Sequence, residues 1–132
     1  MTSSGCGGRV YPNGTTGVWT PGFPGNYPDD ANCYWRLSSV ANITVTFSHF
    51  DLESYYDYLY LYDGGSTTAP LIGEYTGSVV PPPATSSTNQ LYLKFTSDDS
   101  YTESGFKAHF RGKIKILIHQ NTNVYIIYCF CI

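Results

Sequence analysis

The strongest constraint on the fold is an alternation of apolar and polar side chains in four separate segments. The apolar positions are Ile43, Val45 and Phe47 in the first segment, Leu59 and Leu61 in the second, Leu91, Leu93 and Phe95 in the third, and Phe106, Ala108 and Phe110 in the fourth. Because successive side chains of a β-strand point to opposite faces, each segment is predicted to be a strand with one buried face. Further strands are expected near residues 17–19, 34–37 and 71–75.

The stretches between these strands are rich in residues that form turns. The chain has 13 Gly and 8 Pro among its 132 residues, and the prolines of segments 20–24 and 26–28 cannot lie inside a helix. Many short strands joined by turns are typical of an all-β, two-sheet antiparallel β-sandwich of the jelly-roll kind. The length fits a single domain. The net charge is −3, and the sequence has no cluster of basic residues that could neutralise phosphates. Nucleic acid is therefore not an expected partner.

The composition changes after residue 113. Segments 114–118 and 124–132 are apolar, but a polar stretch separates them. We therefore expect no membrane span, which needs about 20 mostly apolar residues. The residues Ile, Lys, Asn, Tyr, Phe and Cys dominate this region, and all of them have A/T-rich codons. We therefore hypothesise that one domain covers residues 5–113 and that residues 114–132 are translated non-coding sequence. The alternative is an unusual terminal strand.

Two cysteines, Cys6 and Cys33, lie in ordinary domain sequence, and the other two lie in the tail. A Cys6–Cys33 disulfide would close a loop of about 27 residues and contribute about 3 kcal/mol in the chain-entropy model. The alternative is two separate buried thiols. A disulfide needs an oxidising compartment, and N-glycosylation sequons at Asn13 and Asn42 point the same way. Residues 1–5 lack the features of a signal peptide, so we expect a piece of a longer secreted protein or an incomplete gene model.

Several carboxylates lie at predicted strand ends. Glu53 follows the first alternating strand, Asp57 opens the second, and Asp98 follows the third. If neighbouring strands bring these ends together, the three groups converge at one edge of the sandwich, where they repel one another unless protons or a cation neutralise them. Such oxygen ligands suit Ca²⁺, which takes roughly six to eight of them. The alternative is that the acids are solvent-exposed turn residues.

Several short motifs occur in a specific order along the chain. They are Cys6-Gly7-Gly8, Pro21-Gly22-Phe23-Pro24, Asn26-Tyr27-Pro28, Cys33-Tyr34-Trp35, Phe50-Asp51-Leu52-Glu53, Tyr56-Asp57-Tyr58-Leu59, Tyr62-Asp63-Gly64, Phe95-Thr96-Ser97-Asp98 and Gly105-Phe106. In this order they resemble a CUB domain, and the resemblance runs over residues 5–113. It implies a β-sandwich of two mostly antiparallel sheets, in agreement with the alternation.

The resemblance also implies a calcium site. In calcium-binding members of the family the ion is held by a glutamate, an aspartate before the aromatic strand and an aspartate in a late loop; these match Glu53, Asp57 and Asp98. By the same resemblance the backbone carbonyl of Ser100 is a further ligand, and Tyr27 hydrogen-bonds the acidic cluster.

One departure from the family pattern concerns the loop that carries the glutamate. Many members have a second disulfide, with one cysteine between the glutamate and the aspartate. Here Glu53 and Asp57 are only four residues apart with no cysteine between them, and Thr76 stands where the other cysteine is expected. The shortened loop changes the expected ligand geometry but not the ligand types.

The function implied by the resemblance is recognition of another extracellular protein. Calcium would fix the acidic loops, and a Lys or Arg of the partner would form charge-assisted hydrogen bonds with the remaining carboxylate oxygens. A carbohydrate-binding module is the alternative, because Tyr58, Tyr60, Tyr62 and Tyr92 lie on non-core strand faces; they can instead pair across strands. No nucleophile elbow and no histidine spacing for a metal is found, so we expect no catalytic function.

Overall fold

The computed structural model describes residues 17–39, 41–111, 117–118 and 125–127, and within them every regular element is a β-strand. The strands are β1 (Gly17–Trp19), β2 (Asn32–Ser38), β3 (Thr44–Asp51), β4 (Tyr58–Tyr62), β5 (Leu71–Tyr75), β6 (Ala84–Thr85), β7 (Gln90–Thr96), β8 (Gly105–Arg111), β9 (Leu117–Ile118) and β10 (Tyr125–Ile127). The prediction of an all-β chain is confirmed.

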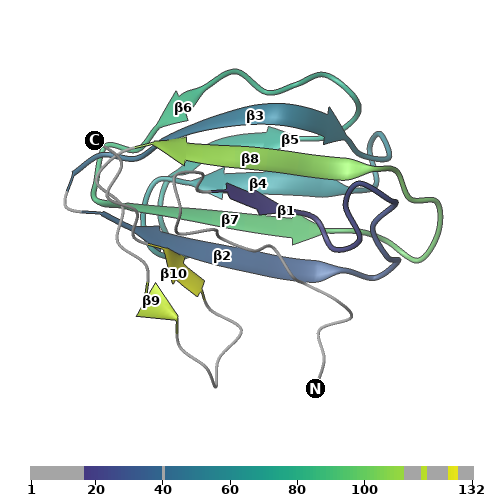
Figure 1. Cartoon of the computed structure of the whole chain (residues 1–132), viewed down its shortest axis with the longest axis horizontal. Coiled ribbons are helices and arrows are strands. Elements are labelled where there is room, and N and C mark those ends of the chain that lie inside the picture. Colours follow the sequence, from purple (N-terminus) through teal and green to yellow (C-terminus); the bar gives the residue numbers. More distant parts are fainter. Residues whose placement is uncertain (1–16, 40, 112–116, 119–124, 128–132) are drawn as a thin grey trace.

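The strands between residues 17 and 111 form two antiparallel sheets of four strands each (Figure 1). The order is β1-β8-β3-β6 in the first sheet and β5-β4-β7-β2 in the second. Beyond β2 the second sheet is extended by β10, which pairs with β2 in parallel, and by β9, which pairs with β10. The β-sandwich is therefore confirmed, whereas the domain boundary near residue 113 stays a prediction.

The core lies between the two sheets and is built from the predicted apolar faces. The buried apolar residues of β2, β3, β4, β7 and β8 are Cys33, Trp35, Leu37, Val45, Phe50, Leu59, Leu61, Leu91, Leu93, Phe95, Phe106, Ala108 and Phe110. Trp35 of β2 meets Phe106 of β8 edge-on with ring centroids 5.8 Å apart, and Phe95 of β7 approaches the same ring at 5.8 Å. Because these rings come from both sheets, their contacts join the two sheets. Full burial of a Phe side chain contributes about 1.5–3 kcal/mol.

Strand β3 departs from simple alternation halfway along. Its pairing with β8 shifts by one residue between Phe47 and His49. Phe50 and Leu52 are buried beyond the shift, whereas uninterrupted alternation would have turned His49 toward the core. The shift therefore sets the direction in which the chain leaves β3 toward Glu53.

Five tyrosines of β2, β4 and β7 lie on the face of the second sheet that points away from the core. Tyr34 stacks on Tyr92 with centroids 6.1 Å apart, Tyr58 stacks on Tyr60 at 5.8 Å, and Tyr62 meets Tyr92 edge-on at 6.1 Å. All five are partly buried. These mutual contacts are cross-strand and same-face pairs of the kind that stabilise sheets, and sugar binding by this face stays a prediction.

Two sequence predictions fall partly outside the described residues. Cys33 is disulfide-bonded and buried in β2, but Cys6 lies outside the described residues, so their pairing stays a prediction. The sequon at Asn13 also lies outside them, whereas Asn42 is exposed in the bend before β3. Within the described part of the chain, no helix is long and apolar enough to cross a membrane.

Gly105 begins β8 at a position that favours glycine. Its φ of 88° lies in the left-handed region, and a Cβ atom there would overlap the side chain of Thr20, which is buried and accepts a hydrogen bond from the Phe106 N–H at 3.2 Å. We therefore expect Gly105→Ala to lower the free energy of unfolding by about 2–4 kcal/mol, through backbone strain and overpacking together. Equilibrium denaturation measures the loss.

The matched control is Gly77→Ala. Gly77 also has a positive φ, of 77°, but the nearest atom to an added Cβ is Ser54 Oγ at 3.1 Å. Backbone strain alone is expected to cost about 1–2 kcal/mol there. Equal losses in the two variants would show that the Thr20 contact does not contribute.

Candidate metal centre

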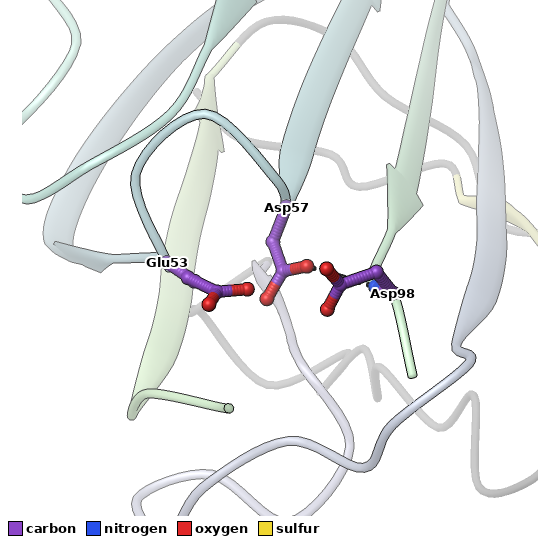
Figure 2. A group of neighbouring side chains, drawn as sticks. All are labelled: Glu53, Asp57 and Asp98. Atoms are coloured by element: carbon purple, nitrogen blue, oxygen red, sulfur yellow. Dashed lines mark hydrogen bonds between the residues drawn. The ribbon is translucent and has the colours of Figure 1, made fainter. Parts of the chain in front are cut away.

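Three carboxylates from three different strand ends meet at one end of the sandwich. Glu53 lies in the turn after β3, Asp57 directly precedes β4, and Asp98 follows β7. One carboxylate oxygen of each lies within 4.8 Å of the others, and Figure 2 shows the three side chains converging on a common point. The structure thus brings together the three residues whose convergence the strand-end positions predicted.

Asp57 is the buried member of the group, with no exposed surface. Its Oδ2 accepts a hydrogen bond from the Tyr27 hydroxyl at 2.6 Å, and its Oδ1 accepts one from the Asp98 N–H at 2.8 Å. A buried carboxylate is tolerated only where such donors replace water. Asp57 therefore ties the loop before β2 and the loop after β7 to the start of β4.

The position of Tyr27 beside the acids is fixed by its own packing and hydrogen bonds. It is almost fully buried, its ring meets Phe95 edge-on at 5.0 Å, and its N–H donates to the Glu103 carbonyl at 3.1 Å. Its hydroxyl also accepts a hydrogen bond from the Glu53 N–H at 3.0 Å. Burial and the Asp57 hydrogen bond raise the pKa of Tyr27, so the hydroxyl remains a donor to Asp57.

Thr76 fastens the short turn between Glu53 and Asp57. Its hydroxyl lies 2.7 Å from the Asp57 carbonyl and 3.1 Å from the Glu53 carbonyl, and it accepts the Tyr55 N–H at 3.0 Å. Tyr55 itself has a positive φ of 70°, a conformation that costs a non-glycine residue energy. In the sequence Thr76 stands out only because a family cysteine is absent there, and its role in this turn was not predicted.

Asp98 is positioned mainly through its backbone. Its carbonyl accepts the Asp30 N–H at 2.8 Å, and its Oδ1 lies 3.3 Å from the Ser100 nitrogen as a weak acceptor. Ser100 is exposed. The use of its carbonyl as a metal ligand stays a prediction.

The electrostatics of the site oppose three full negative charges. Burial, and then the charges of Asp98 and Asp57, raise the pKa of Glu53. Burial also raises the pKa of Asp57, although the hydrogen bonds from Tyr27 and from the Asp98 N–H act in the opposite direction. Glu53 Oε1 is buried without a hydrogen-bond partner. Oxygen ligands, mutual repulsion and an unsatisfied carboxylate oxygen together fit a hard divalent cation.

A family model described as the CUB domain matches residues 6–110. The chain belongs to the CUB domain family. This finding confirms the resemblance drawn from the ordered motifs. CUB domains are extracellular protein-interaction modules and are generally non-catalytic.

Among curated proteins, the chain is similar to segments of much longer chains. It is 42% identical to rat cubilin over 100 residues, which is 70% of this chain and 3% of cubilin. It is 38% identical to mouse tolloid-like protein 2 over 97 residues (69% of this chain and 10% of the relative) and 35% identical to human neuropilin-2 over 112 residues (80% and 12%). The chain thus spans only a small part of these relatives.

Solved structures share the fold at lower sequence identity. The MASP-1 CUB2 domain bound to Ca²⁺ matches with a TM-score of 0.67 and 24% identity, covering 81% of this chain and all of that domain (100%). The extracellular region of zebrafish Gpr126/Adgrg6 matches with a TM-score of 0.68 and 22% identity, covering 85% of this chain and 15% of that one. Both support the two-sheet fold.

The raised pKa values predict how stability depends on pH when divalent cations are removed. Because folding raises the pKa of Glu53 and Asp57 above the ordinary 4.5 and 3.8, the folded state binds these protons more tightly than the unfolded chain. Their stabilising contribution is therefore complete below the ordinary values and is lost as pH rises through the raised ones. In chelator, the free energy of unfolding of the wild type minus that of Glu53→Gln should fall as pH rises above 4.5.

Subtracting one free energy of unfolding from the other cancels the contributions of titratable groups that both proteins share. The pKa of Asp63 is lowered, chiefly by its hydrogen bond from the Ser87 hydroxyl. Asp63 alone would therefore make stability fall as pH drops, the opposite direction. It is present in both proteins and cancels. A difference that stays constant between acidic and neutral pH would contradict a raised pKa for Glu53.

Proposed function

We propose that this CUB domain binds Ca²⁺ through Glu53, Asp57 and Asp98, with the Ser100 carbonyl as a further ligand, and that the acidic loops fixed in this way receive a Lys or Arg of an extracellular protein. The observation that carries the proposal is the convergence of the three carboxylates within 4.8 Å around a buried Asp57. Bound calcium supplies positive charge to this cluster.

The distribution of acids over the molecule supports a cationic partner. Eight of the ten acids of the chain lie at the end of the sandwich that carries the site, in the loops before β2 and β4, at the end of β3, and in the loop between β7 and β8. They are Asp29, Asp30, Asp51, Glu53, Asp57, Asp98, Asp99 and Glu103. One ion neutralises only part of this charge, so the end stays attractive to a basic side chain.

Exposed tyrosines lie beside the acids in the turn before β4 and in the loop after β7. Tyr55 and Tyr56 lie in the turn between Glu53 and Asp57, and Tyr101 lies three residues after Asp98; their exposed fractions are 79%, 63% and 78%. A Lys or Arg side chain can place its aliphatic stem or its charge against such rings. In the proposed complex the carboxylate oxygens bind the cationic head and the tyrosines contact the rest of the side chain.

The setting of this interaction is also part of the proposal. We infer an extracellular location with a Cys6–Cys33 disulfide, because Cys33 is disulfide-bonded and disulfides persist in oxidising compartments. The relatives are long chains of which this domain is a small part. The module would therefore act within a larger protein as a recognition unit without catalysis of its own.

Calcium is expected to raise the thermal stability of the domain. A ligand at 100 times its Kd stabilises the folded state by about 2.7 kcal/mol, and for a domain of this size each kcal/mol raises Tm by roughly 4 °C. Glu53→Gln should lose most of this gain, and Mg²⁺ should give less of it, because flexible loop carboxylates favour the larger ion. Thermal melts in calcium, magnesium and chelator measure these effects.

The matched control for the calcium experiment is Glu74→Gln. Glu74 is an exposed residue of β5 that pairs with Tyr60 of β4, and it is not one of the three clustered carboxylates. It should respond to calcium like the wild type. Asp57→Ala should abolish the calcium response, but it also removes a buried acceptor of two hydrogen bonds and should destabilise the domain in chelator. Identical melting of the wild type with calcium and with chelator would disprove the calcium site.

Partner recognition can be probed with immobilised poly-L-lysine against poly-L-glutamate. Tyr55→Gly should weaken binding to poly-L-lysine about two- to fivefold, the loss of one exposed cation–π contact. It should not reduce folding stability, because glycine relieves the positive φ of 70° at this position. Surface plasmon resonance gives the affinity, and denaturation gives the stability.

The effect of chelator separates specific binding from general attraction. Removing calcium makes the domain more negative, so general attraction to poly-L-lysine should strengthen, whereas binding to the ordered loops should weaken. The control is Leu71→Ser, which changes an exposed apolar residue (50%) of β5 outside the acidic loops. Tighter binding in chelator, or an equal loss in both variants, would contradict the proposed contact.

A further inference from the structure

Asn42 is the exposed member of a sequon whose next residue is anchored in the core. Ile43 is fully buried, its N–H donates to the Ser86 hydroxyl at 2.9 Å, and its carbonyl accepts the Ser86 N–H at 2.8 Å. On the other side, the Ala41 N–H donates to the Ser39 hydroxyl at 3.0 Å. The backbone on both sides of Asn42 is thus held by other residues, and its side chain is directed to the surface.

The bend does not use the Asn42 side chain. Asparagine often occurs in bends because its amide hydrogen-bonds the nearby backbone. Within the part of the chain that the structure describes, the hydroxyls of Ser39 and Ser86 hold this bend, and the Asn42 amide takes part in no hydrogen bond. The usual structural reason for asparagine in a bend is therefore absent at this position.

We propose that Asn42 carries an N-linked oligosaccharide. The sequon Asn42-Ile43-Thr44 has the required third residue and no proline. The amide nitrogen of Asn42 would replace the lipid diphosphate at the anomeric carbon of a lipid-linked oligosaccharide and lose one proton. The proposal rests on the proposed extracellular location, because the donor sugar is met on the secretory route.

The fold places this glycan far from the acidic loops. Asn42 precedes the start of β3, whereas Glu53 follows its end. An eight-residue strand is roughly 25 Å long, and Figure 1 shows the first residues of β3 and the arrowhead that leads to the site at opposite ends of the sandwich. A glycan on Asn42 would cover one end of the domain and leave the binding end open.

The chain offers a sharp test because only Asn13 and Asn42 begin sequons. The full chain with Asn13→Gln, secreted from eukaryotic cells behind an added signal peptide, should carry a glycan that peptide-N-glycosidase removes, leaving Asp at position 42 in the peptide mass spectrum. Adding Asn42→Gln or Thr44→Ala should abolish it. Adding Thr44→Ser should retain it, since serine keeps both the sequon and a hydroxyl near Thr85 Oγ1, which lies 3.0 Å from Thr44 Oγ1.

A secreted Asn13→Gln protein with unmodified Asn42 would overturn the glycan. The calcium melt of the same samples keeps the two proposals apart. The Asn13→Gln/Asn42→Gln protein should show the full calcium response, because position 42 lies at the other end of β3. A glycan without a calcium response would refute the metal site alone, and a calcium response without a glycan would refute the modification alone.

Discussion

The end of the sandwich that carries the three clustered acids depends on one buried carboxylate. Asp57 has no exposed surface, and its two oxygens accept hydrogen bonds from Tyr27 and from the Asp98 N–H, which belong to two other loops. Because an unpaired charge in the interior is costly, these loops must stay in place for the domain to remain folded. The same contacts hold Glu53 and Asp98 beside Asp57. Folding of the sandwich therefore assembles the site.

The hydrogen bonds around Asp57 compensate its burial only in part, because its pKa is still raised and that of Glu53 is raised as well. In this chain no disulfide closes the 53–57 turn; the Thr76 hydroxyl joins the carbonyls at both of its ends. One hydrogen bond contributes about 0.5–1.5 kcal/mol, less than a typical disulfide at about 2–4. A cation would supply the remaining stabilisation, so the turn should depend more on calcium than a cross-linked one.

The sequence predicts the fold well and the site in outline. Alternation identifies the long strands because each has one face in the core and one face toward solvent. The strand-end positions of Glu53, Asp57 and Asp98 indicate that these residues converge. The pairing shift between Phe47 and His49 was not predictable, because it depends on how β3 packs on β8. The roles of Thr76 and of the Tyr27 hydroxyl as an acceptor from Glu53 also depend on the third dimension: the partners are 19 to 26 residues apart.

The coupling of fold and site has a consequence for recognition. If calcium stabilises the folded loops and a partner's Lys or Arg binds those same loops, the two ligands are linked, and each must change the affinity for the other by the same factor. Direct repulsion between ion and cationic head opposes this linkage, whereas ordering of the strained Tyr55 turn favours it. Separating the two charges on different oxygens of the cluster reduces the repulsion. Five further acids at this end of the sandwich carry carboxylate oxygens besides those of the three clustered residues.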